Sequence, residues 1–400
     1  MKKILALLLA FVMVFGLAAC GGSTEETEAA TEAATEAATE AATEAATLPS
    51  ETEAAVETAD MKVAMITDYG DITDQSFNQT TYEAGKAWCE ENSVDYSYYK
   101  PSGDSTAERV AMVDAAVADG YNVILMPGYA FGETIVNTAD LYPDVTFIAL
   151  DVGEGDLGGY VLPANVFCAV YQEELCGYMA GYAAVKLGYK HVGFLGGMAV
   201  PAVIRYGFGF VQGVDAAAVE LGISEEVTVE YAYGNQFYGD ADITAVMDTW
   251  YGEKGVECVF ACGGGIYTSA AEAAAKVGGK VIGVDVDQAA IIDGQYGEGM
   301  TVTSAMKGLY PTVQTLLSEI AAGNFANYGG QVMTLGLVSE KTEENYVQIP
   351  ATTQFEAGKF TAEDYAAMVK GMLDGTIVVS DAIDAMPEVS CTVNDLGNLK

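Results

Sequence analysis

The chain has 400 residues with 17 basic and 57 acidic side chains, and its formal net charge is −40. Such an acidic chain is unsuited to binding nucleic acid, because phosphate recognition relies on clustered Lys and Arg. The only histidine, His191, cannot by itself support a histidine-based zinc site or a Ser-His-Asp triad. The sequence also lacks the Gly-x-x-x-x-Gly-Lys-Ser/Thr pattern that cradles nucleotide phosphates. We therefore expect no metal, no cofactor and no ATP site.

The N-terminus is typical of an exported protein. Lys2 and Lys3 precede residues 4–19, which are uncharged and almost all apolar. This run is shorter than the roughly 20 residues of a membrane-spanning helix and fits a secretory signal. Cys20 follows Leu17-Ala18-Ala19 directly, which resembles the lipobox of bacterial lipoproteins. The resemblance implies that residues 1–20 form a signal peptide ending at a lipidated Cys20, with the body on the outer face of the cell membrane.

Residues 21–60 form an acidic, low-complexity segment. The sequence Thr-Glu-Ala-Ala repeats five times within residues 27–46, and residues 21–58 hold ten glutamates and no basic residue. Such a segment has little apolar surface to bury and repels itself, so we expect a disordered tether. We expect the segment to act as a spacer that holds a folded body away from an anionic membrane surface.

The six cysteines after Cys20 allow a disulfide framework in an exported protein. We favour free thiols instead. Cys168, Cys258 and Cys262 lie in apolar runs that indicate buried strands, where cysteine behaves as a small hydrophobic residue.

The body alternates between short apolar runs and helical patterns from residue 62 onward. Uninterrupted apolar strands separated by helices indicate parallel sheets covered on both faces, which is an α/β fold. The number of such units favours two sheets. Strands are expected at residues 63–67, 96–99, 123–126, 145–150, 192–195, 227–233, 256–261, 281–284 and 300–305, and helices at 76–91, 106–118, 132–141, 173–187, 201–221, 243–251 and 268–277.

Polar residues and glycines follow many of these strands. Asp68, Asp151 and Asp285 each come directly after one, the glycines 263–265 lie just past another, and Lys307 lies just past the last. In open parallel sheets, ligands bind beyond the carboxyl ends of the strands. A single aspartate at such a place is often only a turn or a helix cap, but their joint appearance predicts a cleft.

Several motifs then occur in a fixed order over residues 63–338. Thr67-Asp68 precedes Asp74-Gln75-Ser76-Phe77-Asn78-Gln79. Together with the later segments, this set resembles the basic membrane protein family of lipoproteins, which look like purine nucleoside receptors. The later segments are 192–198, Pro201 with Arg205 and 209–214, Cys262-Gly263-Gly264-Gly265, 282–288 and 303–307.

The resemblance implies a two-lobe, type I periplasmic-binding-protein fold in which each lobe is a parallel sheet flanked by helices and the ligand lies in the cleft. It assigns residues 61–168 plus about 305–335 to the N-terminal lobe, and 169–304 plus about 336–400 to the C-terminal lobe. Three chain crossings are then expected near residues 167–171, 301–307 and 333–338. After residue 336 the resemblance fades, and residues 378–400 carry no functional signal.

The family's site places a nucleobase between two aromatic rings and holds the ribose with a carboxylate. By resemblance, the two rings are Phe77 and Phe237, with Tyr238 as a competitor for the second position. Stacking on an aromatic ring is worth roughly 1–3 kcal/mol per base, and carboxylates accept hydrogen bonds from N–H and hydroxyl groups. The implied ligand-binding residues are Asp68, Phe77, Asn78, Asp151, Phe237, Gly264, Asp285 and Lys307.

The sequence therefore predicts a membrane-anchored solute-binding protein that closes on a nucleoside and delivers it to an ABC permease, with permease and ATPase encoded separately. It predicts that the protein is not an enzyme. A sugar or another small metabolite in the same cleft, and a sensor without transport, remain open. A nucleoside hydrolase is a further alternative, since Asp68 and Asp285 are able to act as acid and base, but no nucleophile paired with a base accompanies them.

Overall fold

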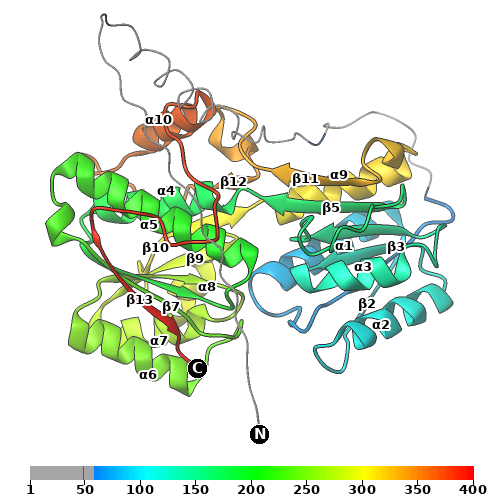
Figure 1. The fold of residues 1–400 in the computed structure, drawn as a ribbon, viewed down its shortest axis with the longest axis horizontal. Helices are drawn as coiled ribbons and strands as arrows, with labels where there is room; N and C mark the ends of the chain where they lie inside the picture. Colours follow the sequence, from blue (N-terminus) through cyan, green and yellow to red (C-terminus); the bar gives the residue numbers. More distant parts are fainter. Residues whose placement is uncertain (1–47, 49–57) are drawn as a thin grey trace, which may run out of the picture. The chain divides into compact units, whose positions relative to one another are not determined.

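The computed structural model describes Leu48 and residues 58–400 (Figure 1). The predicted signal peptide at residues 1–20, the lipid attachment at Cys20 and nearly all of the predicted tether at 21–60 lie outside the described residues. None of the helices in the described part of the chain is both long and apolar enough to cross a membrane.

The described residues form two sheets, and the first has six strands in the order β11-β5-β4-β3-β1-β2. Every neighbouring pair in it is parallel. Its inner strand β3 is buried at every residue, as expected for a parallel strand covered on both faces. The strands are β1 (Lys62–Ile66), β2 (Asp95–Tyr99), β3 (Val123–Pro127), β4 (Thr146–Leu150), β5 (Val166–Tyr171) and β11 (Gln331–Leu335).

The second sheet has seven described strands in the order β12-β10-β9-β8-β6-β7-β13. Its pairs are parallel except for β12 with β10. We call the parts built on the two sheets the first and second lobes. The strands are β6 (His191–Gly196), β7 (Thr228–Tyr233), β8 (Cys258–Cys262), β9 (Lys280–Asp285), β10 (Thr301–Lys307), β12 (Val347–Gln348) and β13 (Thr392–Asn398).

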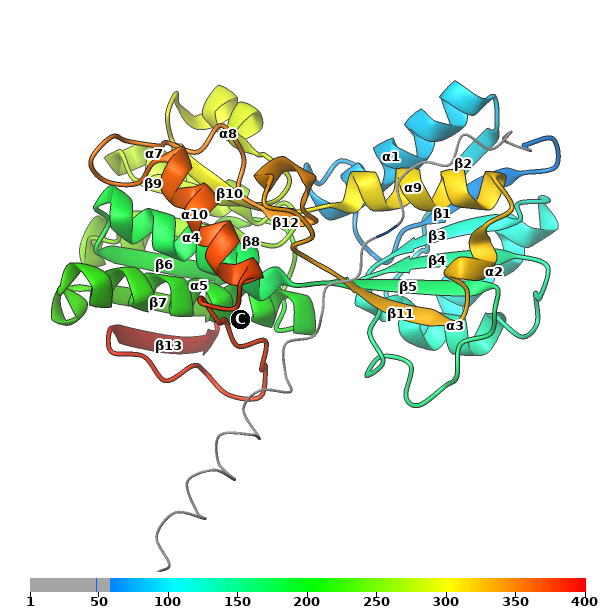
Figure 2. The same ribbon diagram turned by 90° about the horizontal axis from the view of Figure 1, so that it is seen from above.

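Helices cover both faces of each sheet (Figures 1 and 2). In the first lobe α1 and α9 lie on one face and α2 and α3 on the other; in the second lobe α4 and α5 lie opposite α6, α7 and α8. The α/β class and the two sheets are confirmed. The helices are α1 (Phe77–Asn92), α2 (Thr106–Ala118), α3 (Gly132–Thr138), α4 (Glu173–Leu187), α5 (Pro201–Leu221), α6 (Ala241–Thr249), α7 (Tyr267–Val277), α8 (Ala289–Tyr296), α9 (Leu309–Ala321) and α10 (Ala362–Leu373).

The chain passes between the lobes three times. It leaves the first sheet after β5 and enters α4, and it leaves the second sheet after β10 and enters α9. Helix α9 packs on the first lobe, where Trp88 Nε1 of α1 donates to Ser318 Oγ at 2.9 Å. The third crossing leads from β11 to β12. All three passages lie close together between the two lobes (Figures 1 and 2), so they can act together as a hinge.

The last forty residues stay on the second lobe. Strand β13 pairs with β7 in parallel and so extends the edge of the second sheet. Asn394 Nδ2 donates to the buried Glu230 at 2.9 Å, and the backbone N–H groups of Ser390 and Cys391 donate to Asp215 of α5. This segment therefore covers an edge that would otherwise expose unpaired backbone groups.

All six cysteines of the described chain are free and buried. Cys168 lies in β5, and Cys258 and Cys262 lie in β8, as the apolar runs around them indicate. Burial raises the pKa of Cys89 and of Cys391 to about 12, so these thiols are poor nucleophiles at neutral pH.

Helices α4 and α5 approach each other closely because glycines line their contact. A Cβ at Gly177 would lie 2.3 Å from the Tyr206 carbonyl oxygen, and a Cβ at Gly209 would lie 2.1 Å from that of Glu174. Gly181 and Gly213 repeat the pattern one turn further along each helix. The close approach brings the first turn of α4 beside the first turns of α5, where the cavity described below is built.

We expect Gly209→Ala to destabilise the protein by about 1–3 kcal/mol, because the new methyl group meets backbone atoms that have no room to move. Gly294→Ala is the matched control, since it lies within α8 with no atom within 4 Å of the added Cβ. The control should be neutral or gain about 0.5–1 kcal/mol from helix propensity. Urea unfolding of the soluble chain from residue 21 measures both, and equal stabilities for the two variants would contradict the packing argument.

Candidate functional site

A cavity of about 720 Å³ lies between the two lobes. The residues that follow β1, β3 and β4 line it from the first lobe, and those at or after the ends of β6 to β10 line it from the second. This is the place where ligands bind in parallel α/β sheets. All eight residues predicted from the sequence line it: Asp68, Phe77, Asn78, Asp151, Phe237, Gly264, Asp285 and Lys307.

The backbone is strained around this cavity. Asp151, Asn235 and Asp285 line it and have φ values of 60°, 57° and 64°. Residues other than glycine seldom adopt such left-handed conformations, and those that do cluster at functional sites. Each of the three lies at or just after the carboxyl end of a strand. The turn there directs the side chain into the cleft instead of along the sheet.

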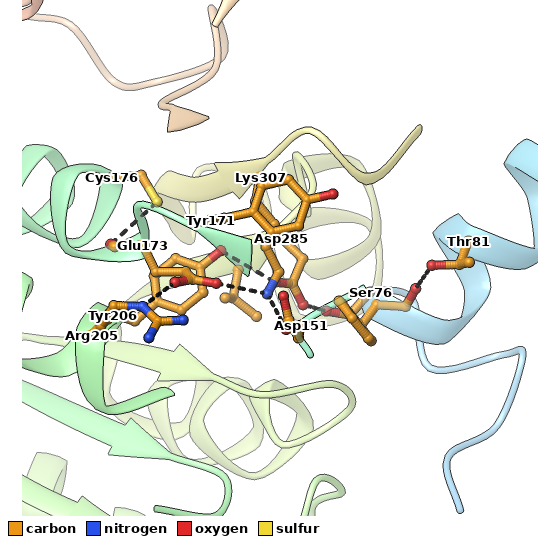
Figure 3. A network of polar contacts seen from close by, with 12 residues as sticks. Ser76, Thr81, Asp151, Tyr171, Glu173, Cys176, Arg205, Tyr206, Asp285 and Lys307 are labelled. Carbon is orange, nitrogen blue, oxygen red and sulfur yellow. Dashed lines mark hydrogen bonds and ion pairs between the residues drawn. The ribbon is translucent and has the colours of Figure 1, made fainter. Parts of the chain in front are cut away.

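The ammonium group of Lys307 lies at the centre of a buried polar network (Figure 3). Its Nζ is 2.6 Å from Asp151 Oδ2, 3.4 Å from Glu173 Oε1 and 3.8 Å from Asp285 Oδ1. Burial alone would lower the pKa of Lys307, but the three carboxylates raise it above its ordinary value. Lys307 is therefore charged at neutral pH, and it joins Asp151 of the first lobe to two carboxylates of the second.

Two side chains hold the carboxylate of Asp285. Ser76 Oγ of the first lobe donates to Oδ2 at 2.5 Å, and the Tyr206 hydroxyl donates to Oδ1 at 3.3 Å. The serine lies at the start of α1, whose backbone N–H groups at Ser76, Asn78 and Gln79 donate to Asp74. Asp74 thus caps α1 and fixes the serine that reaches across to the second lobe.

Two buried oxygens at the cavity have no hydrogen-bond partner among the described residues. They are Asn78 Oδ1 and Asp151 Oδ1, and both residues line the cavity. A buried acceptor left unsatisfied costs roughly 1–3 kcal/mol. Burial raises the pKa of Asp151 to about 6, although Lys307 opposes that shift. Both oxygens are therefore positioned to accept hydrogen bonds from a bound ligand.

Asp68 presents a carboxylate at the first-lobe side of the cavity. Its Oδ1 accepts hydrogen bonds from the backbone N–H groups of Tyr69 and Gly70, both at 2.6 Å. Burial raises the pKa of Asp68 even though these two bonds lower it. Gly128 packs against the same carboxylate, where a Cβ would lie 2.8 Å from Oδ2. The second oxygen is thereby held between the ends of β1 and β3.

The two predicted aromatic residues line the cavity from opposite lobes. The centroid of the Phe77 ring lies 4.7 Å from Lys307 Nζ, which is a cation–π distance. The Phe237 ring rests on glycines of the second lobe, since a Cβ at Gly197 would lie 2.3 Å from it and one at Gly263 would lie 2.8 Å away. Tyr238 also lines the cavity, but its side chain is 62% exposed.

Glu173 and Arg205 complete the network without lining the cavity. Glu173 is fully buried and accepts a hydrogen bond from Arg205 Nε at 2.6 Å while its other oxygen faces Lys307. Sequence reasoning missed Glu173, and it used Arg205 only as part of a motif that carries the family resemblance. The available signal was a pair of glutamates opening an apolar helix directly after a buried strand, where an unpaired acid is unfavourable.

The sequence matches the family described as "ABC transporter substrate-binding protein PnrA-like" over residues 61–359. Among similar proteins, the "ABC transporter nucleoside-binding protein BmpA" of Lactococcus lactis subsp. cremoris is 26% identical over 340 residues, which cover 78% of this chain and 91% of that protein. "Basic membrane protein B" of Borreliella burgdorferi is 26% identical over 302 residues, covering 74% of this chain and 82% of that protein. An "uncharacterized lipoprotein" of Pyrococcus abyssi is 22% identical over 335 residues, covering 80% and 79%.

Solved structures share the fold. An ABC transporter solute-binding protein from Aeropyrum pernix K1 superposes with a TM-score of 0.62 at 21% identity, covering 80% of this chain and 87% of that one. A solute-binding protein from Conexibacter woesei gives a TM-score of 0.60 at 23% identity, covering 80% and 99%. The two-lobe, type I periplasmic-binding-protein fold expected from the sequence is confirmed.

Glu174 provides a pH test of the network's electrostatics. It is 3% exposed, and burial together with the charge of Glu173 raises its pKa to about 8. A carboxyl group with a raised pKa in the folded state stabilises the fold at low pH and loses that contribution as pH rises. We expect the free energy of unfolding of the parent to fall relative to that of Glu174→Gln between about pH 4.5 and pH 8. Above about pH 8 the difference between the two should stay constant.

Thermal unfolding across that pH range measures the effect. The exposed Glu225→Gln is the control and should give a curve parallel to the parent at every pH. A Glu174→Gln curve that also runs parallel to the parent would show that this carboxyl group titrates in the folded protein as it does in the unfolded chain.

Proposed function

This chain belongs to the PnrA-like family of ABC transporter substrate-binding proteins, and we propose that it captures a purine nucleoside between its lobes and delivers it to a separate permease. One observation carries the proposal. Phe77 and Phe237 line the same cavity from opposite lobes, together with the carboxylates Asp68, Asp151 and Asp285. Flat aromatic faces suit a nucleobase, and carboxylates suit the N–H groups and hydroxyls of a nucleoside.

The volume and charge of the cavity support an uncharged ligand. About 720 Å³ lies within the usual range of small-molecule sites, roughly 300–1,000 Å³. Within the described part of the chain, one cation, Lys307, lines the cavity, and its ammonium already contacts three carboxylates. A phosphate would meet no uncommitted positive charge there, while six aspartates would repel it. The aspartates are Asp68, Asp71, Asp74, Asp104, Asp151 and Asp285.

The arrangement supports capture by closure. The three crossings form a hinge on one side of the cavity, and contacts such as Ser76 with Asp285 join the lobes across it. A ligand that touches both lobes stabilises the closed arrangement, which a permease can distinguish from the open one. Lipidation at Cys20 would hold the protein near the permease, and similar proteins in Pyrococcus species are described as lipoproteins.

Binding without turnover fits the relatives. The family and the similar protein of Lactococcus lactis are described as substrate-binding and nucleoside-binding proteins, which are not enzymes. Incubation with inosine tests this directly, because a hydrolase would release free hypoxanthine and ribose.

A thermal-shift screen of the soluble chain from residue 21 against nucleosides, free bases and sugars tests the ligand. A ligand bound only by the native state adds about 4 kcal/mol of stability at a thousandfold excess over Kd. We expect large shifts with inosine, guanosine or adenosine and none with sugars. Shifts with sugars alone would show that the ligand is a sugar and not a nucleoside. The absence of a shift with any nucleoside would overturn the ligand assignment, while the family and the fold would stand.

Site variants test the ligand-binding residues that the family resemblance implies. We expect Phe77→Ala and Asp285→Ala each to weaken nucleoside binding at least tenfold in isothermal titration calorimetry, because one removes a stacking face and the other a hydrogen-bond acceptor. Tyr310→Ala and Asp242→Asn alter exposed side chains and should bind as the parent does. Parent-like affinity in both site variants would show that the ligand lies elsewhere.

A further inference from the structure

Tyr69 joins the two lobes at the cavity. It follows Asp68 in the loop between β1 and α1, so it belongs to the first lobe, and it lines the cavity. Its hydroxyl donates to Met198 Sδ at 3.3 Å, and its ring stacks on Phe237 with centroids 6.2 Å apart and planes 25° apart. Both partners belong to the second lobe, following β6 and β7. Every one of these contacts is lost if the lobes separate.

The loop of residues 67–76 makes further contacts of the same kind. Besides Ser76 with Asp285, Gln288 Nε2 of the second lobe donates to the Gln75 carbonyl oxygen at 2.9 Å. Gln75 has a left-handed φ of 57°, a conformation that costs free energy in a residue other than glycine. The strained turn directs its carbonyl toward the opposite lobe. This loop, unlike the hinge crossings, therefore contacts the second lobe only when the cleft is closed.

The two rings of this pair belong to opposite lobes. Phe237 is fixed by its own lobe, because its ring rests on the backbones of Gly197 and Gly263 with no space for a Cβ. Tyr69 reaches it from the other lobe, where its hydroxyl also contacts Tyr129, and both rings are partly buried. Its ring covers apolar surface of Phe237 that would otherwise face solvent, and centroid separations of 4.5–7 Å are those at which aromatic pairs attract.

We propose that Tyr69 is a gate residue: from the first lobe it closes on Phe237 and Met198 and so controls how slowly a bound ligand leaves the cavity. The inference rests on the proposed nucleoside-binding function for its ligand, but the closing contact itself does not require a ligand. Contacts that hold the lobes together must break before a ligand leaves the cavity, so their loss raises the dissociation rate constant.

Stopped-flow displacement measures release. The soluble chain from residue 21 is loaded with the fluorescent nucleoside 2-aminopurine riboside, which is displaced by excess inosine. We expect Tyr69→Ala to raise the dissociation rate constant about tenfold. Tyr69→Phe keeps the ring and loses the contacts of the hydroxyl with Met198 and Tyr129, so its dissociation rate constant should rise less than threefold. Tyr310→Ala, at an exposed tyrosine of α9, should match the parent.

A second measurement needs no ligand. Spin labels at Ala111→Cys on α2 and Ala245→Cys on α6 report the separation of the lobes, since both positions are exposed and lie away from the hinge (Figure 1). The native cysteines of the described chain are buried and should stay unlabelled. Pulsed electron spin resonance should show longer label separations for Tyr69→Ala than for Tyr69→Phe or the parent, with circular dichroism spectra unchanged.

The two measurements separate failure of the gate from failure of the ligand. If the parent releases 2-aminopurine riboside slowly and Tyr69→Ala releases it equally slowly, the gate proposal is wrong and the nucleoside assignment stands. If the parent binds no nucleoside, the ligand assignment fails and the label separations decide the gate alone. Label separations in Tyr69→Ala that equal those of the parent would then overturn it.

Discussion

A buried ammonium group ties the two lobes together. Lys307 Nζ contacts Asp151 on the first lobe and Glu173 and Asp285 on the second. A charge removed from water is costly unless opposite charges and hydrogen bonds replace its hydration. Separating the lobes would remove Asp151 from this set, so the position of one lobe relative to the other is coupled to how well the lysine is solvated. The rest of the site is arranged around that constraint.

The constraint is met through close backbone packing between α4 and α5. Glycines at matching turns let α4 and α5 approach until a methyl group would strike the opposite backbone. Only at that separation does Glu173, the first residue of α4, reach both Arg205 of α5 and Lys307. The carboxylate of Glu173 then forms ion pairs with two cations at once and is fully buried. The polar network thus depends on the absence of side chains in a helix contact, which couples the stability of the second lobe to the electrostatics of its cavity.

The strained residues contribute to closure in another way. Asp151 and Asp285 adopt left-handed backbone conformations at strand ends, and Gln75 does so in the loop that reaches the second lobe. Conformations of this kind persist when surrounding contacts outweigh their cost. Here those contacts are Lys307 with both aspartates, and Gln288 with the Gln75 carbonyl group. Two of them join opposite lobes, so the strain and the closed arrangement support each other.

Much of the architecture could be predicted from the sequence. Helix α5 begins at Pro201 and ends before Gly222, as expected from a proline at the first helical position and a left-handed glycine cap. The aspartates of the cavity were identifiable because residues at the carboxyl ends of parallel strands converge on one edge. By contrast, α8 to α10, β11 and β12 were not assigned from local patterns, and β13 gave no signal because its pairing with β7 involves residues more than 160 positions apart.

The sequence by itself determined the α/β class, the order of most strands and helices along the chain, and the candidate residues that follow the strands. The tertiary structure alone decided the strand order in each sheet, the partners of Lys307, and the approach of Tyr69 to Phe237 and Met198. The physical reason is range: hydrophobic periodicity and turn chemistry act between near neighbours, whereas ion pairs and ring contacts across a cleft join residues that only the completed fold brings together.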